Sequence, residues 1–151
     1  MNGVSKITVT EDISLVNFKN ISRDLSVASR IMTEFSEQGI NIDMISQSAP
    51  TGETADVSFT IDSKDLVRTL SIVQRFRVQY PNVRPSVSSG CCKIQLYGEE
   101  MRERYGVASA AIAAVAGTDA ELTLISTGEV EISLLVPQSS CDEAVRALEE
   151  A

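Results

Sequence analysis

An internal repeat is the feature of this sequence that most constrains its fold. The segment VASRIMTEFSEQGINIDMIS (27–46) aligns without gaps on VASAAIAAVAGTDAELTLIS (107–126), 80 residues further along the chain. Apolar residues recur at the i, i+4, i+8 spacing of one helical face, at Val27, Ile31 and Phe35 and again at Val107, Ala111 and Val115. We therefore expect the chain to contain the same structural unit twice, each copy with an amphipathic helix.

Two segments with alternating apolar and polar residues follow each expected helix, and this alternation is typical of half-buried strands. In the first copy the apolar positions are Ile40, Ile42 and Met44, then Val57, Phe59 and Ile61. In the second copy they are Leu122 and Leu124, then Val130, Ile132, Leu134 and Val136. Each pair of segments is expected to form an antiparallel hairpin, and the shorter connection in the second copy predicts the tighter turn.

A second helix closes each copy, and a strand precedes each first helix. The closing helices are indicated by VRTL (67–70) and VRAL (145–148), and the first of them offers Leu66, Leu70 and Val73 as its apolar face. The preceding strands are expected at 13–18 and 92–97. Each copy thus has the order β-α-β-β-α, one strand short of a ferredoxin-like unit.

The sixth element has a different source in each copy. Residues 82–88 can supply it in the first copy, with Pro85 placing that strand at an edge or a bulge. The second copy has no such segment, but residues 4–10 alternate ahead of an expected turn at Glu11 and Asp12. We expect this spare strand to complete the second sheet, because unpaired sheet edges promote aggregation.

The predicted fold class is accordingly α+β, with two ferredoxin-like βαββαβ domains that have antiparallel sheets and lie side by side. The first domain, residues 13–89, is predicted to be inserted into a second one formed by residues 3–10 plus 91–151.

Composition argues against several classes of function. The net charge of −8, without a separate Lys/Arg cluster, argues against nucleic acid or a membrane as a partner. The chain has no histidine, so the usual general base and the commonest metal ligand are missing, and we predict no catalytic residue, no metal site and no cofactor. Cys91, Cys92 and Cys141 lack metal-type spacing and are interpreted as structural thiols. With no bilayer-length apolar stretch and no signal segment, we expect a cytoplasmic protein.

Two features of each copy are candidates for contact with a ligand. The loops 22–26 and 103–106 precede a helix, and the backbone N–H groups of a helix start suit a carboxylate. The strand starts 40–42 and 120–122 offer acceptors to an ammonium group. When two such domains pair, the loop of one can face the strand of the other and form a pocket for a zwitterion.

Plain structural roles remain open for these residues. Ser22, Asp24 and Ser26 are also N-cap candidates, and Asn41 and Glu121 equally suit a solvated strand.

Several segments resemble the regulatory region of aspartate kinases (aspartokinases). INIDMISQ (40–47) and ADVSFTI (55–61) are similar to the first regulatory domain of that family, and the preceding VASRI is similar to its VAARI. YGVASAAI, LTLIST and EVEISLLVP resemble its second domain, and AVRALEEA resembles its closing helix, so the resemblance covers nearly the whole chain. It implies two ACT domains, the first inserted into the second, that bind threonine or lysine at their shared interface. The implied role is allosteric feedback on the first step of lysine, threonine and methionine biosynthesis.

The resemblance also implies partners and a set of effector-binding residues. A homodimer is expected, as is a catalytic kinase subunit or domain as a partner; the chain itself lacks the kinase's Gly-rich nucleotide site and is not expected to be an enzyme. The predicted effector-binding residues, with Asn41 taken from the strand start, are Arg23, Asp24, Leu25, Ser26, Val27, Ala28, Asn41, Gln47, Tyr105, Gly106, Glu121 and Leu122.

Two departures from the family pattern change the implied pocket. Arg23-Asp24-Leu25-Ser26 stands where the family has an acidic residue followed by Pro-Gly, and Glu121 replaces an expected Asn. A different effector is therefore an open alternative, and so is an ACT-type dimerisation or assembly module that binds no small molecule.

Overall fold

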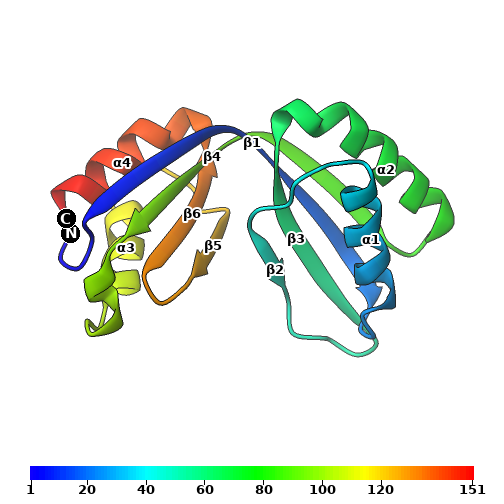
Figure 1. Cartoon of the computed structure of the whole chain (residues 1–151), viewed down its shortest axis with the longest axis horizontal. Coiled ribbons are helices and arrows are strands. Elements are labelled where there is room, and N and C mark those ends of the chain that lie inside the picture. Colours follow the sequence, from blue (N-terminus) through cyan, green and yellow to red (C-terminus); the bar gives the residue numbers. More distant parts are fainter. The chain divides into compact units, whose positions relative to one another are not determined.

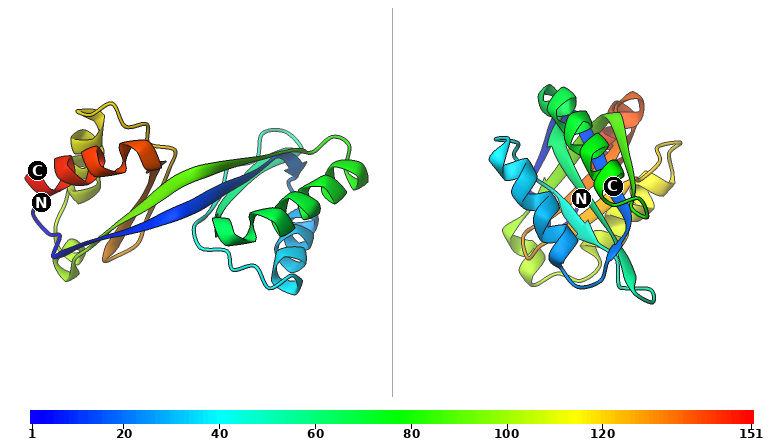
Figure 2. Two further views of the ribbon diagram at one scale, coloured as in Figure 1. Left: turned by 90° about the horizontal axis from the view of Figure 1, so that it is seen from above. Right: turned by 90° about the vertical axis from the view of Figure 1, so that its right-hand side faces the viewer.

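The structure, a computed structural model, describes residues 1–151 and divides them into two compact units (Figure 1). The inserted unit comprises Ile13–Ser89, and the discontinuous unit comprises Met1–Asp12 together with Gly90–Ala151. Two long strands, β1 (Lys6–Ser22) and β4 (Arg84–Tyr97), contribute to both units and are neighbours in the strand order β2-β3-β1-β4-β6-β5 (Figure 2). Each unit has the strand and helix content of a ferredoxin-like fold, which confirms the predicted α+β class.

The predicted turn at Glu11 and Asp12 is wrong, because β1 continues through both residues. A two-residue hairpin turn of the usual type needs positive φ at both central residues, and of these two only Asp12 has it, at 57°. One left-handed residue can be accommodated within a strand as a local irregularity. In the same way β4 joins the two segments predicted as separate strands, 82–88 and 92–97, across Gly90 with φ 71°.

The inserted unit has the strand order β2-β3-β1-β4, with β2 (Ile45–Gln47) and β3 (Thr54–Asp62) antiparallel. Strand β3 also pairs antiparallel with β1, from Ile13 opposite Asp62 to Ser22 opposite Thr54. The helices are α1 (Ser26–Glu37) and α2 (Leu66–Gln79). The first half of β4 is the edge of this four-strand set, which is where Pro85 was expected.

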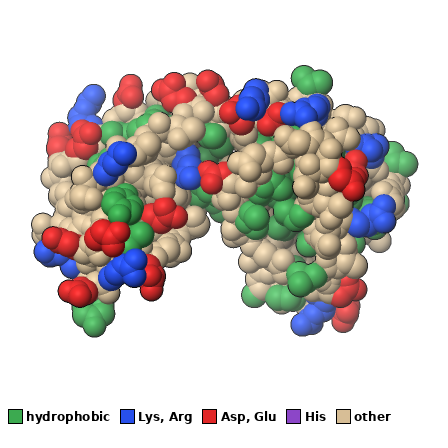
Figure 3. All heavy atoms as spheres, in the orientation of Figure 1, with side chains coloured by type: hydrophobic (Ala, Val, Ile, Leu, Met, Phe, Trp, Pro, Cys, Tyr) green, Lys and Arg blue, Asp and Glu red, His purple; other side chains and the backbone are tan.

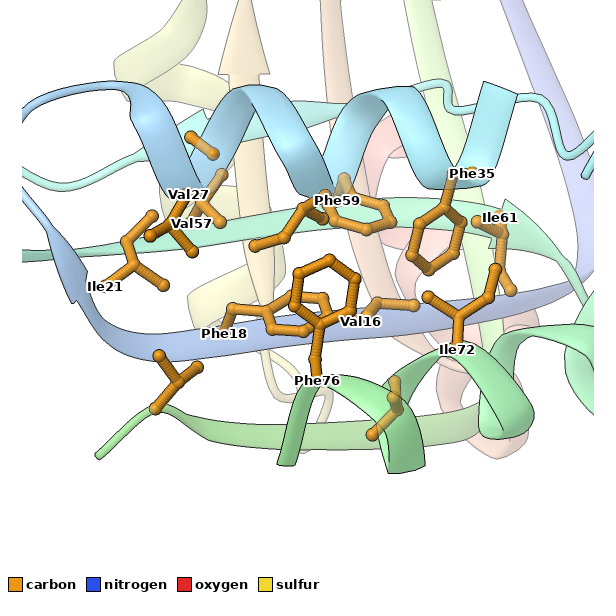
Figure 4. Close-up of a cluster of buried hydrophobic side chains, with 14 of the residues drawn as sticks. Val16, Phe18, Ile21, Val27, Phe35, Val57, Phe59, Ile61, Ile72 and Phe76 are labelled. Carbon is orange, nitrogen blue, oxygen red and sulfur yellow. The ribbon is translucent and has the colours of Figure 1, made fainter. Parts of the chain in front are cut away.

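The core of the inserted unit combines aliphatic side chains with a group of phenylalanines (Figure 4). All four Phe residues of the chain are buried there, each 4% exposed or less: Phe18, Phe35, Phe59 and Phe76. Phe59 lies at the centre, with ring centroids 4.9 Å from Phe35 in an edge-on contact and 6.2 Å from Phe18 in a stacked one. Such aromatic pairs contribute about 0.5–1.5 kcal/mol beyond the burial of their surface.

The discontinuous unit has an aliphatic core instead. Its hairpin pairs β5 (Leu124–Thr127) with β6 (Glu131–Pro137), and β6 pairs antiparallel with β4. Its helices are α3 (Val107–Ala116) and α4 (Cys141–Glu150). The buried cluster contains Ile94, Leu96, Leu134 and Leu148, and Val4 and Ile7 from the start of the chain pack against it.

Cys92 on β4 and Cys141 at the start of α4 form a disulfide inside this cluster. The interpretation of all three cysteines as thiols is therefore wrong for this pair. Their 49-residue separation concealed the pairing, since only the tertiary fold brings β4 against α4.

Two further differences concern where strands begin and how α2 is oriented. Strand β2 begins at Ile45 rather than Ile40. Just before it the ladder is irregular, because the Asp43 N–H donates to the Thr60 carbonyl (3.1 Å) and the Met44 N–H to the Thr60 side-chain oxygen (3.0 Å), so two successive amides bind one residue of β3. The buried face of α2 comprises Thr69, Ile72, Val73 and Phe76, whereas Leu70 is 49% exposed. The sequence of α2 offers two apolar faces, and the one that carries Phe76 removes more surface from water.

Candidate functional site

The loop before α1 contains six of the predicted effector residues, from Arg23 to Ala28. Arg23 anchors the loop to the β2–β3 connection: its backbone N–H donates to the Glu53 carbonyl and its guanidinium to the Gly52 carbonyl, both at 3.0 Å. Leu25 precedes the helix with its side chain 64% exposed. Val27 and Ala28 are each 8% exposed and belong to the core, so only their backbone could face a ligand.

Asp24 occupies the start of α1 with its own carboxylate. Its Oδ1 accepts hydrogen bonds from the Ser26 backbone N–H (3.0 Å) and from the Ser26 hydroxyl (2.5 Å). The Ser26 hydroxyl, then the Ser26 backbone and the Ser22 hydroxyl hold the pKa of the Asp24 carboxyl below its usual 3.8. Leu25 is the N-cap residue and makes no side-chain cap hydrogen bond, so Asp24 binds only the first amide of α1, that of Ser26. It presents a negative charge where an incoming carboxylate was expected to bind.

The start of α3 likewise has no side-chain cap hydrogen bond. Gly106 precedes the helix with φ 83°, a conformation that favours glycine, and the Cβ of another residue would meet no atom there. Tyr105 is fully exposed. Two hollows of about 540 and 300 Å³ share Tyr105, Gly106 and Val107 in their walls. Within the discontinuous unit, the first amides of α3 are thus open to an anionic group.

The remaining predicted residues do not all lie near the loops. Some are at the loop end of their unit and others are at the opposite end. Gln47 is opposite Val57, which is opposite Phe18, so Gln47 lies toward the end of β1 from which the Arg23–Ala28 loop begins. Asn41 follows the other end of α1, about 18 Å away along a 12-residue helix, and is exposed in a hollow with Gly39 and Ile42. The inserted unit therefore brings Gln47 toward the loop but not Asn41.

The discontinuous unit repeats this separation. Glu121 and Leu122 follow α3 and lie at the end of that helix away from Tyr105. Glu121 is exposed, and Leu122 packs against the aliphatic core. Neither lines the hollows at the start of α3.

Thr127 is a candidate residue that the sequence analysis missed. It lines the 300 Å³ hollow together with Tyr105, Gly106 and Gly128. The signal was available, because the 80-residue offset of the repeat aligns Thr127 with Gln47. In each unit the loop before the first helix and the end of the second strand thus belong to the same end of the sheet.

None of the helices is both long enough and apolar enough to cross a membrane. The fold and the placement of these loops define a protein of two ferredoxin-like α+β units, in which the start of α3 is open and the start of α1 is occupied by Asp24. The model of the ACT domain family matches residues 19–75 and 94–151, and the chain belongs to that family.

Curated relatives with similar sequences are aspartokinases. The aspartokinase of Geobacillus stearothermophilus is 31% identical over 151 residues, which is 98% of this chain and 35% of the relative. That of Corynebacterium glutamicum is 32% identical over 139 residues, which is 89% of this chain and 32% of the relative. The chain thus spans about a third of the length of the curated relatives it matches.

Solved structures with a similar fold include regulatory subunits. A crystal structure described as aspartokinase alpha and beta subunits has a TM-score of 0.87 at 26% identity and covers 97% of both chains. The ligand-free regulatory subunit of aspartate kinase from Thermus thermophilus has a TM-score of 0.89 at 23% identity and covers 99% of both chains. The chain is therefore similar to the regulatory ACT region of aspartate kinases, as its sequence predicted.

Proposed function

We propose that this chain is a non-catalytic regulatory module that senses a small amino acid, with threonine and lysine as the first candidates. Its ACT family membership and its similarity to aspartokinases support this proposal. We further propose that its two ACT domains coincide with the two compact units, so that residues 13–89 are inserted into the second domain.

The observation that carries the proposal is the uncapped start of α3 beside two hollows. An effector carboxylate there would accept hydrogen bonds from the first amides of the helix, which have no intrahelical partner, and would gain from the helix dipole. Thr127 can donate its hydroxyl to the same ligand. A hollow of about 300 Å³ is at the lower end of the range of small-ligand sites.

In the inserted unit, Asp24 gives the loop before α1 a complementary role, which is to attract the ammonium group of the effector. A carboxylate already held there by Ser26 would repel a second carboxylate and attract an ammonium group. We propose that Asp24, with Gln47 nearby, contacts the effector amine. For binding of the effector amine, the loss of the family's Pro-Gly turn before α1 then matters less than the position of the acidic charge on Asp24.

Asn41, Glu121 and Leu122 lie at the end of their own units opposite the loops, so neither unit by itself forms a pocket that includes both these residues and a loop. This is consistent with the homodimer that we propose. A catalytic aspartate kinase, as a separate subunit or as a further domain, is the proposed recipient of the signal.

Calorimetry and thermal-shift measurements test amino-acid binding directly. Threonine and lysine are titrated into the full chain, followed by threoninol, which lacks the carboxylate, and N-acetylthreonine, which lacks the ammonium. We expect both analogues to bind at least about tenfold more weakly than the effector, because a charge-assisted hydrogen bond is worth about 1.5–3 kcal/mol.

Three variants assign the site. Asp24→Asn and Thr127→Val are each expected to weaken binding, whereas Glu37→Gln, an exposed carboxylate at the far end of α1, serves as the matched control. If Asp24→Asn instead tightens binding, the start of α1 receives the carboxylate and the assignment of the two loops is reversed. If the folded protein responds to none of the standard amino acids, the chain is better described as an assembly module.

A further inference from the structure

An arginine connects the two walls of the hollow of about 300 Å³ at the start of α3. One wall is the segment that leads from η2 (Glu99–Arg102) into α3 and includes Tyr105. The other wall is the end of β5 with the turn after it, and it includes Thr127. The Arg102 guanidinium donates to a carboxylate oxygen of Glu129, in that turn, at 2.8 Å. Glu129 lines the hollow and Arg102 does not, and we call their ion pair the strap.

Neighbouring contacts hold the strap in place. The Arg102 guanidinium also donates to Glu99 at 3.4 Å, and Glu99 accepts a hydrogen bond from the Tyr97 hydroxyl at 2.5 Å. The Tyr97 hydroxyl, and then the charge of Arg102, keep the pKa of the Glu99 carboxyl below its usual 4.5. Beside the strap, the Gly98 N–H donates to the Val130 carbonyl at 2.9 Å. The turn is thus tied to the α3 side of the hollow by a backbone hydrogen bond and by an arginine that lies between two carboxylates.

The inserted unit has an equivalent connection with different chemistry. Ahead of α1, the Arg23 guanidinium donates to the Gly52 carbonyl and its backbone N–H to the Glu53 carbonyl, both at 3.0 Å. Arg102 is within one residue of the position that aligns with Arg23 in the repeat. The strap, however, joins two side chains that are 54% and 77% exposed, and an exposed ion pair is weak and is screened by salt. Of the two connections, the strap is therefore the one that opens easily.

We propose that the strap positions the hollow for the effector: Arg102, acting through Glu129, holds Thr127 at a fixed separation from the first amides of α3. This inference rests on the function proposed above, in which those amides and Thr127 contact one ligand. Walls that are already ordered lose less entropy when a ligand binds, so an intact strap raises the affinity. Acidic and basic side chains lie together over the segment between β4 and α3, at the lower left of the space-filling view (Figure 3).

The two members of the strap separate positioning from simple attraction, because they carry opposite charges. R102Q should weaken effector binding under either explanation. E129Q removes a negative charge near the site of the effector carboxylate, so charge alone predicts tighter binding. The strap predicts the opposite: E129Q should raise the effector Kd about two- to fivefold at low salt, the range expected for an exposed ion pair. The double variant R102Q/E129Q should bind no more weakly than R102Q, because the strap can be lost only once.

Hydrogen exchange of the free protein tests the strap without any ligand. The amides of Gly98 and Gly128, which donate to the Val130 and Glu131 carbonyls, should exchange about two- to fivefold faster in R102Q and E129Q. Raising the salt from about 0.05 to about 0.5 M should have the same effect on the wild type and little effect on either variant.

E100Q is the matched control for the exchange experiment. It breaks the ion pair between Arg104 and Glu100 (2.9 Å), which lies in the same segment but does not reach the turn after β5. The Gly98 and Gly128 amides should therefore exchange in E100Q as they do in the wild type.

Calorimetry with threonine and lysine, read beside the exchange data, distinguishes the possible failures. Unchanged exchange in R102Q and E129Q would overturn the strap even if an effector binds. An E129Q variant that binds the effector as tightly as the wild type, or more tightly, would show that Arg102 acts by charge alone. If exchange reveals the strap but no amino acid binds, the proposed function fails and the positioning role fails with it.

Discussion

Gly98 offers the sharpest test of how the start of the chain is held in the discontinuous unit. Gly98 follows β4, and a Cβ built on it would overlap the Gly3 carbonyl oxygen, a backbone atom that cannot move without the N-terminal segment moving. Immediately next to this contact, the Ser5 N–H donates to the Tyr97 carbonyl at 2.8 Å, and the Ser5 hydroxyl approaches the same oxygen at 3.2 Å. Gly98→Ala is therefore expected to detach the first residues of the chain from β4.

The expected cost follows from these contacts. Two hydrogen bonds contribute about 0.5–1.5 kcal/mol each, and withdrawing Val4 from the aliphatic core costs about 1 kcal/mol more. The loss is about 2–4 kcal/mol of unfolding free energy, equivalent to a melting temperature lower by roughly 5–15 °C for a chain of this size. Because the cost falls on the discontinuous unit, the Phe core of the inserted unit should keep its stability.

Urea denaturation and hydrogen exchange measure both parts of this prediction. The amides of residues 5–10 should lose protection in Gly98→Ala, while those of β3 should keep it. Gly117→Ala is the matched control: its Cβ would be 3.5 Å from the Ala114 carbonyl oxygen, an ordinary contact, and its φ is −77°. At a position whose backbone angles alanine can adopt without strain, a Gly→Ala change typically stabilises the folded protein by about 0.4–1 kcal/mol. If Gly98→Ala unfolds like the wild type and residues 5–10 stay protected, the account of how this strand is held fails.

Three further outcomes are expected. Thr69 is fully buried with its hydroxyl unpaired, so Thr69→Val, nearly the same shape, should raise the unfolding free energy by about 1 kcal/mol in urea melts; lower stability would show that the hydroxyl has a partner. Reducing the Cys92–Cys141 disulfide, which closes a 49-residue separation, should lower the unfolding free energy by up to about 4 kcal/mol, and a C92A/C141A variant should be insensitive to reductant. The pKa of Asp24 is lowered in the folded state, so its contribution to stability is present above its unfolded pKa and is lost as pH falls through the folded one. The difference in urea midpoint between wild type and Asp24→Asn should thus shrink between about pH 5 and about pH 3, and a constant difference would contradict this assignment.

The local sequence pattern was sufficient to predict those helices and hairpins whose residues are close together in the chain. The 80-residue repeat predicted two units with the same helices and hairpins, and the shorter second hairpin does have the shorter connection, Gly128–Val130. The same repeat offset aligns Thr127 with Gln47, but only the hollow beside Gly106 identifies Thr127 as a candidate site residue. Two expectations stay predictions: the division into domains 13–89 and 3–10 plus 91–151, and the set of effector residues. Independent folding of each domain would test the first, and binding of an effector would test the second.

Amino-acid sequence by itself thus determined the α+β class, the repeat and the resemblance to aspartate kinases, since periodicity and motif order are carried by neighbouring residues. Only the tertiary structure decided that β1 runs unbroken through the turn predicted at Glu11 and Asp12, and that β4 joins two segments predicted as separate strands. The partner strands supply the hydrogen bonds that hold one left-handed residue in an extended chain. Tertiary packing also chose which face of α2 is buried and joined Cys92 to Cys141. At the start of α1 it placed the Asp24 carboxylate on the Ser26 amide, where a ligand carboxylate had been expected, because a side chain two residues away reaches that amide first.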